Sequence, residues 1–357
     1  MLFDLTPVDR DTYREAIRDR LPSRIIDSHT HVYSTPAYPD GIVENKRLVS
    51  WPARVAKTNP IEDLLDTYRL MFPDKMVLPL VFSGVQPVDR IDELNAYTLH
   101  AAKTEKVPSL LFTHPEWPAD VFEERLRRER RQGIKVYLNL APSYLPSGEI
   151  RIFDFLTHEH LEVVDRLGLI VMLHVPRTER LRDEVNLAQV LEIEERYANL
   201  QVILAHVGRA YCNEDVGDAF EILKGTERLV MDVSANTNSW VFARAMEALG
   251  SSRLLFGSDL PVVRMRMKRV CRDGIYMNRV PSGLYGDVSN DKNMEEVERP
   301  ESDAFTFFLY EEILSLLEAA DEVGLSVDDL EKLFYENARG ILERTGYPIE
   351  NSRLASK

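Results

Sequence analysis

The stretch Ile-Ile-Asp-Ser-His-Thr-His at positions 25–31 places two histidines at the end of a short apolar run. Short runs of Val, Ile and Leu are typical of strands buried on both faces of a parallel sheet. His29 and His31 are two residues apart, and the strand period of two places both side chains on one face. We therefore predict a first strand whose carboxyl end presents two imidazoles on the same side.

Further apolar runs follow along the chain, and charged amphipathic segments at 119–132, 185–199 and 242–249 lie between some of them. The runs cover residues 76–82, 109–113, 134–138, 169–173, 201–205, 229–234 and 253–257. Strands that alternate with helices predict a parallel sheet, and eight of them favour closure into an α/β protein of the (β/α)8 TIM-barrel type. An open doubly wound sheet would need a glycine-rich phosphate turn after the first strand, where this sequence has Ser-His-Thr-His.

No break in composition divides the chain, so we expect residues 1–357 to form a single domain with its core over about 24–343. Two long loops are predicted, from 32 to about 60 after strand 1 and from 261 to about 303 after strand 8. Both follow strand carboxyl ends, the face on which barrel active sites form. We expect the second loop to cover the active site, and the chain from Phe305 to form C-terminal helices that close the barrel. The basic residues of the second loop are Arg264, Arg266, Lys268, Arg269 and Arg272.

The composition, with 44% hydrophobic and 29% charged residues, is that of an ordinary globular protein. A formal charge of −15 argues against nucleic acid or an anionic membrane as a main partner. No apolar run is long enough for a membrane span, and the N-terminus lacks the features of a signal peptide, so we expect a cytoplasmic protein. Cys212 and Cys271 are too few for a disulfide framework and lack the spacing of a thiolate metal site.

Five residues of ligand type end predicted strands: His29, His31, His174, His206 and Asp259. The carboxyl ends of barrel strands meet at one mouth, so we expect these side chains to converge. Burying so many polar groups without partners would be costly, and a divalent cation supplies the partner. Neutral imidazole and carboxylate suit zinc, with manganese or iron as alternatives. The sequence therefore predicts one divalent metal.

These motifs resemble those of the amidohydrolase superfamily, in particular its amidohydrolase-2 branch. Residues 26–31 resemble the strand-1 signature of the branch, and 173–174, 204–206 and 256–261 resemble its strand-5, strand-6 and strand-8 motifs. Residues 334–339, Phe-Tyr-Glu-Asn-Ala-Arg, are similar to its C-terminal helix. The motifs occur in the order of the family and extend over most of the chain.

The resemblance implies that His29, His31 and His174 bind the metal, with Asp259 on the metal or on its water. A metal with an open position lowers the pKa of bound water and polarises the substrate oxygen. Asp259 would take the proton of that water and pass it to the leaving group. His206 would stabilise the developing oxyanion, or bind a second metal if one is present.

Binuclear relatives carry a carboxylated lysine on strand 4 that bridges two metals. Lys135 lies early in its predicted strand, short of the strand end where the other ligands lie. We therefore expect Lys135 to bind substrate or to stabilise the barrel floor. Tyr137 and Asn139 lie on the same side of that strand and are predicted to bind substrate with it.

Arg177 lies three residues past His174, where it resembles an arginine with which related lactonases grip a substrate carboxylate. A loop arginine paired with an acid such as Glu179 is the alternative. Other polar residues at or just past strand ends are candidates to line the pocket. They are His114, Arg209, Asn236 and Arg264, and Arg264 is predicted to bind an anionic substrate.

The expected function is metal-dependent hydrolysis of a small, carboxylate-bearing lactone or amide through a metal-activated water. The same branch contains non-oxidative decarboxylases and hydratases of aromatic-derived acids on nearly the same ligands, and such a reaction is the alternative. A binding protein with a vestigial site is a third possibility. The presence of all five polar residues argues against it. Many relatives are dimers or larger, so the resemblance also implies a homo-oligomer.

Overall fold

The computed structural model describes residues 3–36, 47, 49 and 51–355. All eight predicted strands are present, although several are shorter than their apolar runs. The strands are β1 (Arg24–His31), β2 (Met76–Phe82), β3 (Leu110–Phe112), β4 (Gly133–Lys135), β5 (Ile170–Leu173), β6 (Gln201–Leu204), β7 (Val230–Asp232) and β8 (Leu254–Leu255).

Parallel pairing links the strands in chain order. β1 pairs with β2, and β3 to β8 pair successively. Parallel bridges between Val81 and Ser109 and between Thr30 and Leu260 connect these two sheets at both seams. The chain therefore folds as the predicted (β/α)8 barrel.

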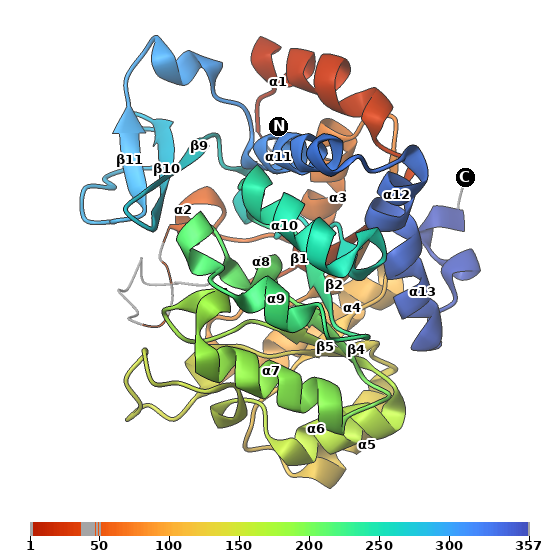
Figure 1. Ribbon diagram of the computed structural model, residues 1–357. Helices are drawn as coiled ribbons and strands as arrows, with labels where there is room; N and C mark the ends of the chain where they lie inside the picture. Colours follow the sequence, from red (N-terminus) through yellow and green to blue (C-terminus); the bar gives the residue numbers. More distant parts are fainter. Residues whose placement is uncertain (1–2, 37–46, 48, 50, 356–357) are drawn as a thin grey trace.

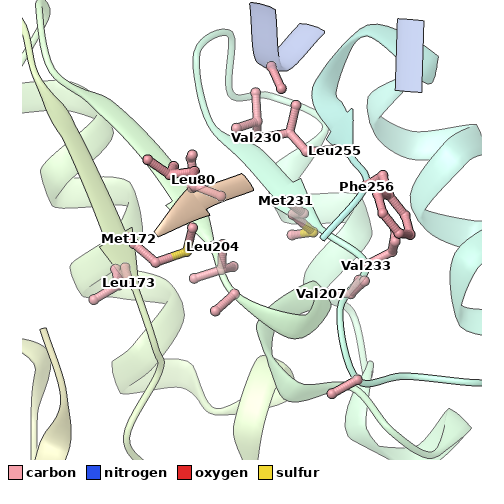
Figure 2. Close-up of a cluster of buried hydrophobic side chains, with 14 of the residues drawn as sticks. Leu80, Met172, Leu173, Leu204, Val207, Val230, Met231, Val233, Leu255 and Phe256 are labelled. Atoms are coloured by element: carbon pink, nitrogen blue, oxygen red, sulfur yellow. The ribbon is translucent and has the colours of Figure 1, made fainter. Parts of the chain in front are cut away.

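The strands are buried on both faces, which explains why their sequences are continuously apolar rather than alternating. Every residue of β3, β4 and β5 is buried. Figure 2 shows one cluster in which five strands meet, with Leu80, Met172, Leu204, Met231 and Leu255 contributed by β2, β5, β6, β7 and β8. This packing holds the strand ends, and therefore the groups that follow them, in fixed positions.

Helices surround the strands (Figure 1). The three predicted amphipathic segments appear as α5, α7 and α10, and the predicted C-terminal helices as α11 to α13. The helices are α1 (Pro7–Thr12), α2 (Pro52–Val55), α3 (Ile61–Met71), α4 (Ile91–Glu105), α5 (Ala119–Glu129), α6 (His158–Leu167), α7 (Glu184–Arg196), α8 (His206–Arg209), α9 (Ala219–Leu223), α10 (Ser239–Leu249), α11 (Phe308–Val323), α12 (Val327–Glu331) and α13 (Asn337–Arg344). Among the described residues, no helix has both the length and the apolar character that crossing a bilayer requires.

The segment after β8, residues 261–303, forms a small sheet of its own, and we call this segment the lid. β9 (Lys268–Arg272) and β10 (Ile275–Pro281) form an antiparallel hairpin, and β11 (Met294–Val297) pairs parallel to β10. This sheet projects from one side of the barrel (Figure 1). The loop after β1 falls partly outside the described residues, at 37–46, 48 and 50.

Cys212 and Cys271 are joined by a disulfide with an S–S distance of 2.10 Å. Two cysteines make no framework, as the sequence predicts, but the analysis of the sequence did not anticipate that they are bonded to each other. The bond links the chain after β6 to β9 of the lid. The lid is therefore attached covalently to the barrel at a point far from its own ends.

Candidate active site

The carboxyl ends of β1 and β8 bring His29, His31 and Asp259 together. The backbone N–H of Asp259 donates to the carbonyl oxygen of His29 at 2.8 Å. The Nε2 atoms of His29 and His31 lie 3.6 and 3.1 Å from the same oxygen, Oδ1 of Asp259. This approach requires Gly257, because a Cβ there would lie 2.9 Å from the Cβ of His29. The two-residue spacing in β1 thus presents both imidazoles to one carboxylate.

Three histidines are oriented by hydrogen bonds on the sides of their rings that face away from Asp259. Carboxylate and carbonyl oxygens only accept hydrogen bonds, so each Nδ1 that contacts one carries the proton, and each Nε2 has a lone pair in the neutral ring. The acceptors are the Asp232 carboxylate for His29 (2.9 Å), the Ser83 carbonyl for His31 (2.8 Å) and the Ser234 carbonyl for His206 (3.1 Å).

This donor set fits a cation. His31 Nε2 and Asp259 Oδ1 are 3.1 Å apart, and both have lone pairs when the ring is neutral. Burial, with help from the Lys135 charge, lowers the pKa of His29 to about 3, and burial also lowers the pKa of His206. Within the described chain, His29, His206 and Asp259 form a group whose ligand atoms all lie within 4.8 Å of one another. Neutral imidazoles that share a carboxylate are the form in which a divalent metal is bound.

The predicted ligand His174 lies beside this group. Its ring centroid is 5.3 Å from that of His206, and its Nε2 is 3.5 Å from the hydroxyl of Tyr137. Burial lowers its pKa well below the usual value, and the charge of Arg209 adds to the effect. Its buried Nδ1 has no hydrogen-bond partner among the described residues. The residues present therefore fit a metal, and His206 lies among the ligands that the sequence predicts.

Asp232, the last residue of β7, is a site residue that the sequence analysis missed. It is fully buried and contacts His29 Nδ1, the backbone N–H of His206 at 2.9 Å and the hydroxyl of Ser234. Burial alone would raise the pKa of this carboxyl, but the interactions with His29 outweigh it and hold the pKa well below its usual value. A carboxylate behind a ligating histidine fixes the tautomer and raises the basicity of the ring. An acid at the end of a predicted strand is the signal that could have identified it.

Lys135 lies closer to the metal group than the sequence predicts. The expectation that it precedes the strand end is wrong: β4 ends at Lys135, because the chain turns into a 3-10 helix at Leu138–Leu140. Its Nζ is 3.5 Å from His29 Nε2 and 5.0 Å from the centroid of the Phe82 ring. Burial lowers its pKa to about 8. The ammonium group therefore stands beside the predicted metal ligands.

Three residues predicted to bind substrate are not among the described residues of the cavity wall. Asn139 donates to a loop carbonyl at 2.8 Å, and Arg177 pairs through Nε with Asp183 at 2.9 Å. Arg264 is buried against the loop after β1, where it donates to Asn59. Each of these side chains contacts an internal partner. The prediction failed because the distance of a residue from a strand end does not fix the direction of its side chain.

A cavity of about 430 Å³ lies above the metal group and includes its histidines and Asp259. Tyr137 and Arg209 line it as expected, whereas His114 and Asn236 are not among the described lining residues. In the part of the wall that the structure describes, Asp259 is the only carboxylate. The cations of the wall are Arg47, Lys135, Arg180, Arg209, Arg269 and Lys292. The site thus concentrates positive charge in an acidic protein.

The lid forms part of this wall, as predicted. Of its five basic residues that the sequence singled out, Arg269 alone is among the described lining residues, and it is joined there by Tyr276 and Lys292 of the lid. Arg266 instead pairs with Asp9 of α1, and Arg272 pairs with Glu295 within the lid sheet. The sequence therefore placed the lid correctly but not the individual charges that face the cavity.

A left-handed turn connects the metal group to the outer part of the cavity. His206, Val207, Gly208 and Arg209 have φ values of 57°, 48°, 62° and 65°. Such a conformation costs roughly 1–2 kcal/mol for each residue that carries a side chain. Gly208 is needed because a Cβ there would lie 2.5 Å from Cδ1 of Leu181. The turn places both its first residue, His206, and its last, Arg209, in the cavity wall.

Solved structures share this fold. An amidohydrolase from Burkholderia multivorans with bound zinc matches with a TM-score of 0.55 and 16% identity, over 91% of this chain and 99% of that one. A probable 2-pyrone-4,6-dicarboxylic acid hydrolase from Acinetobacter baumannii with bound citric acid gives 0.51 and 14%, over 89% and 99%. A dihydroxybenzoic acid decarboxylase from Polaromonas sp. JS666, with manganese and 2-nitroresorcinol, gives 0.52 and 14%, over 90% and 97%.

No curated protein matches this sequence. The sequence model of the amidohydrolase family, however, matches residues 26–344, which extend from β1 to the end of α13. The matched range contains His29, His31, His174, His206 and Asp259. The chain therefore belongs to the amidohydrolase family, in the amidohydrolase-2 branch that its motifs predict.

Proposed function

We propose that this protein is a metal-dependent hydrolase of a small, carboxylate-bearing lactone or amide. One observation carries the proposal: the Nε2 lone pairs of His29, His31 and His206 face the region of the Asp259 carboxylate at the inner end of a cation-rich cavity. Acceptors gathered in this way need a cation between them, and the surrounding positive charge suits an anionic substrate.

His29, His31, His206 and Asp259 would hold the metal, with His174 adjoining. Imidazole and carboxylate ligands suit zinc, with manganese or iron as alternatives. The zinc in the Burkholderia neighbour and the manganese in the Polaromonas neighbour support this assignment. When bound, a divalent metal would polarise the substrate oxygen and lower the pKa of a water.

Asp259 would move the proton. Burial raises the pKa of its carboxyl, but the interactions with His31, His206 and His29 outweigh burial and lower the pKa below its usual value. The ionised carboxylate would accept a proton from the attacking water and deliver it to the leaving group. In neutral His206 the Nδ1 proton is donated toward Ser234, which leaves Nε2 as an acceptor. This favours a ligand or base role for His206 over the oxyanion role expected from the family, and Lys135 is the cation placed to stabilise an oxyanion.

Non-oxidative decarboxylation is the second candidate, and the cationic wall is the observation that favours it. Lys135 lies beside the metal group, where a reacting carboxylate would be held. The Polaromonas neighbour is a decarboxylase and the Acinetobacter neighbour a probable hydrolase, so this fold carries both reactions. The two candidates share ligands and differ in which bond of the substrate breaks.

The test uses protein stripped by a chelator and reloaded with zinc, manganese or iron, with metal measured by plasma mass spectrometry. A panel of carboxylate-bearing lactones, amides and hydroxybenzoates is then scored separately for ring or amide opening and for CO2. We expect about one metal per chain and metal-dependent hydrolysis. Release of CO2 alone would establish the second candidate, and full metal loading without any turnover would indicate a vestigial binding site. Failure to take up metal would overturn the metalloenzyme assignment.

A further inference from the structure

A second group of charged residues lies at the outer end of the cavity. Arg180 Cζ is 5.2 and 5.3 Å from the ring centroids of Tyr211 and Tyr276, and Arg269 Cζ is 5.2 and 4.6 Å from the same two rings. Arg209 lies close enough to Tyr211 to oppose the rise in pKa, to about 12, that burial causes in that phenol. All five residues line the cavity. We call them the arginine cluster.

Only one of these guanidinium groups has a carboxylate partner among the described residues. Arg180 Nη1 pairs with Asp215 at 2.6 Å. Arg209 donates from Nη1 to backbone carbonyls at 3.0, 3.2 and 3.4 Å, and Arg269 donates from Nη1 and Nε to neutral oxygens at 2.6 and 2.8 Å. Within the described chain, nothing accepts a hydrogen bond from Nη2 of any of the three. Each guanidinium is thus anchored through part of its donor set, and its Nη2 group remains for a ligand.

A buried acid, Glu312, interacts electrostatically with Arg269 but forms no ion pair with it among the described residues. Glu312 on α11 is fully buried, and burial, with the charge of Asp27, raises its pKa well above the usual value. Neither carboxyl oxygen of Glu312 has a hydrogen-bond partner among the described residues, and an arginine keeps its proton. Arg209 and Arg269 consequently bring two positive charges without carboxylate partners into a partly enclosed space. Such charges are costly unless an anion accompanies them.

The cluster is near the metal group and is held together covalently. The ring centroids of His206 and Tyr211 are 6.4 Å apart, and those of Tyr211 and Tyr276 are 4.9 Å apart. Cys212 follows Tyr211, and Cys271 pairs with Tyr276 across the lid hairpin, so their disulfide joins the two halves of the cluster. A site assembled in advance loses less free energy when a ligand is ordered in it.

We propose that the arginine cluster binds a second carboxylate of the substrate, so that the enzyme acts on compact dicarboxylates. One carboxylate or its ester or amide lies at the metal group, and the other lies against Arg209 and Arg269 in the same cavity. Guanidinium groups match the planar carboxylate with two parallel hydrogen bonds. The position of the reacting group at the metal rests on the proposed function. The binding of the second carboxylate by the arginine cluster does not depend on turnover.

The test is isothermal titration calorimetry of the zinc-loaded protein with benzoate, benzene-1,3-dicarboxylate and 3-phosphonobenzoate. We expect the dicarboxylate to bind about 10- to 100-fold more tightly than benzoate, the range for hydrogen bonds to charged groups. Arg269→Gln should remove most of this preference and leave benzoate binding unchanged. The matched control is Arg272→Gln, which removes the same charge from the same strand at a residue that pairs with Glu295. This control should retain the preference.

Equal affinity of the wild-type protein for benzoate and the dicarboxylate would overturn the subsite without recourse to any variant. So would a preference that survives in Arg269→Gln whose circular dichroism and melting curve show a folded protein. Tighter binding of the phosphonate than of the dicarboxylate would overturn the assignment to a carboxylate. Because titration requires no turnover, a failure to hydrolyse the substrate panel would count against the proposed function alone.

Discussion

The inner end of the cavity takes its polar groups from the barrel strands and the residues just past them, whereas the outer end takes them from longer loops and the lid. His29 and Asp232 lie within β1 and β7, whose backbones are fixed by parallel pairing. Arg209 follows β6 in a strained turn, and Arg269 belongs to a hairpin tied to the barrel by a disulfide. The comparison teaches that the barrel fixes the groups proposed to react, while the added segments form the wall through which a substrate would reach them.

The largest effect is expected from Asp259→Asn at the inner end. The variant should lower kcat by about 10²- to 10⁴-fold, because general acid–base catalysis is worth that much, while an amide oxygen retains part of the metal binding. Steady-state kinetics and metal analysis of the same preparation test this. The exposed Asp218→Asn serves as the control for the loss of one charge. Activity within about tenfold of wild type would show that Asp259 does not move the proton.

Asp232→Asn should weaken metal binding at the inner end without removing any of the proposed ligands. We expect metal affinity to fall about 10- to 100-fold, since the carboxylate that orients His29 is replaced by a neutral amide. Competition with a chromophoric chelator measures the affinity, and Asp218→Asn is again the control. If the variant bound metal as tightly as wild type, Asp232 would have no part in preparing the site.

Loss of the disulfide should affect the outer end alone. In the double variant Cys212→Ser, Cys271→Ser, we expect KM for an acidic substrate to rise about 2- to 10-fold. Without the disulfide, the arginine cluster must be ordered when the substrate binds. Metal content should be unchanged, and the melting temperature should fall, because the bond closes a loop between cysteines 59 residues apart. Reduction of the wild-type protein should reproduce the KM change and have no effect on the double variant. A change in metal content instead of KM would show that the two ends are not separable.

The smallest effect concerns the base of the lid, where Arg266 pairs with buried Asp9 at 2.7 Å. Burial raises the pKa of Asp9, but hydrogen bonds from Arg266, Thr6 and Thr306 outweigh it and lower the pKa below its usual 3.8. The ionised carboxylate therefore stabilises the fold fully above pH 3.8. That contribution is lost as the pH falls through the lower pKa of the folded state.

Asp9→Asn should accordingly make the free energy of unfolding less dependent on pH below pH 4. For one proton the difference in slope is at most about 1.4 kcal/mol per pH unit. Urea unfolding at several pH values between 5 and 3 measures it, with the exposed Asp11→Asn as the matched control. If the free energy of unfolding depended on pH equally in wild type and in Asp9→Asn, the Asp9–Arg266 pair would not stabilise the fold as described.

The inner end of the cavity could be predicted from the sequence, whereas the outer end could not. The strands and the inner histidines could be identified because apolar runs mark the strands and the histidines lie at or just past the strand ends. Arg177 and Arg264 were selected by their distance from a strand end, and both are bound to internal partners. Arg269 faces the cavity because of a hairpin and a distant disulfide, and no local stretch of sequence contains that information.

The left-handed turn from His206 to Arg209 fixes the backbone between one residue of the metal group and one residue of the arginine cluster. Its four residues have consecutive positive φ values, so the turn has little room to extend or contract without a change of backbone. Side-chain substitutions at His206 or Arg209 can alter what each residue binds but not the backbone that separates the two. A related enzyme that accepts longer acids would therefore be expected to differ by an insertion in this turn.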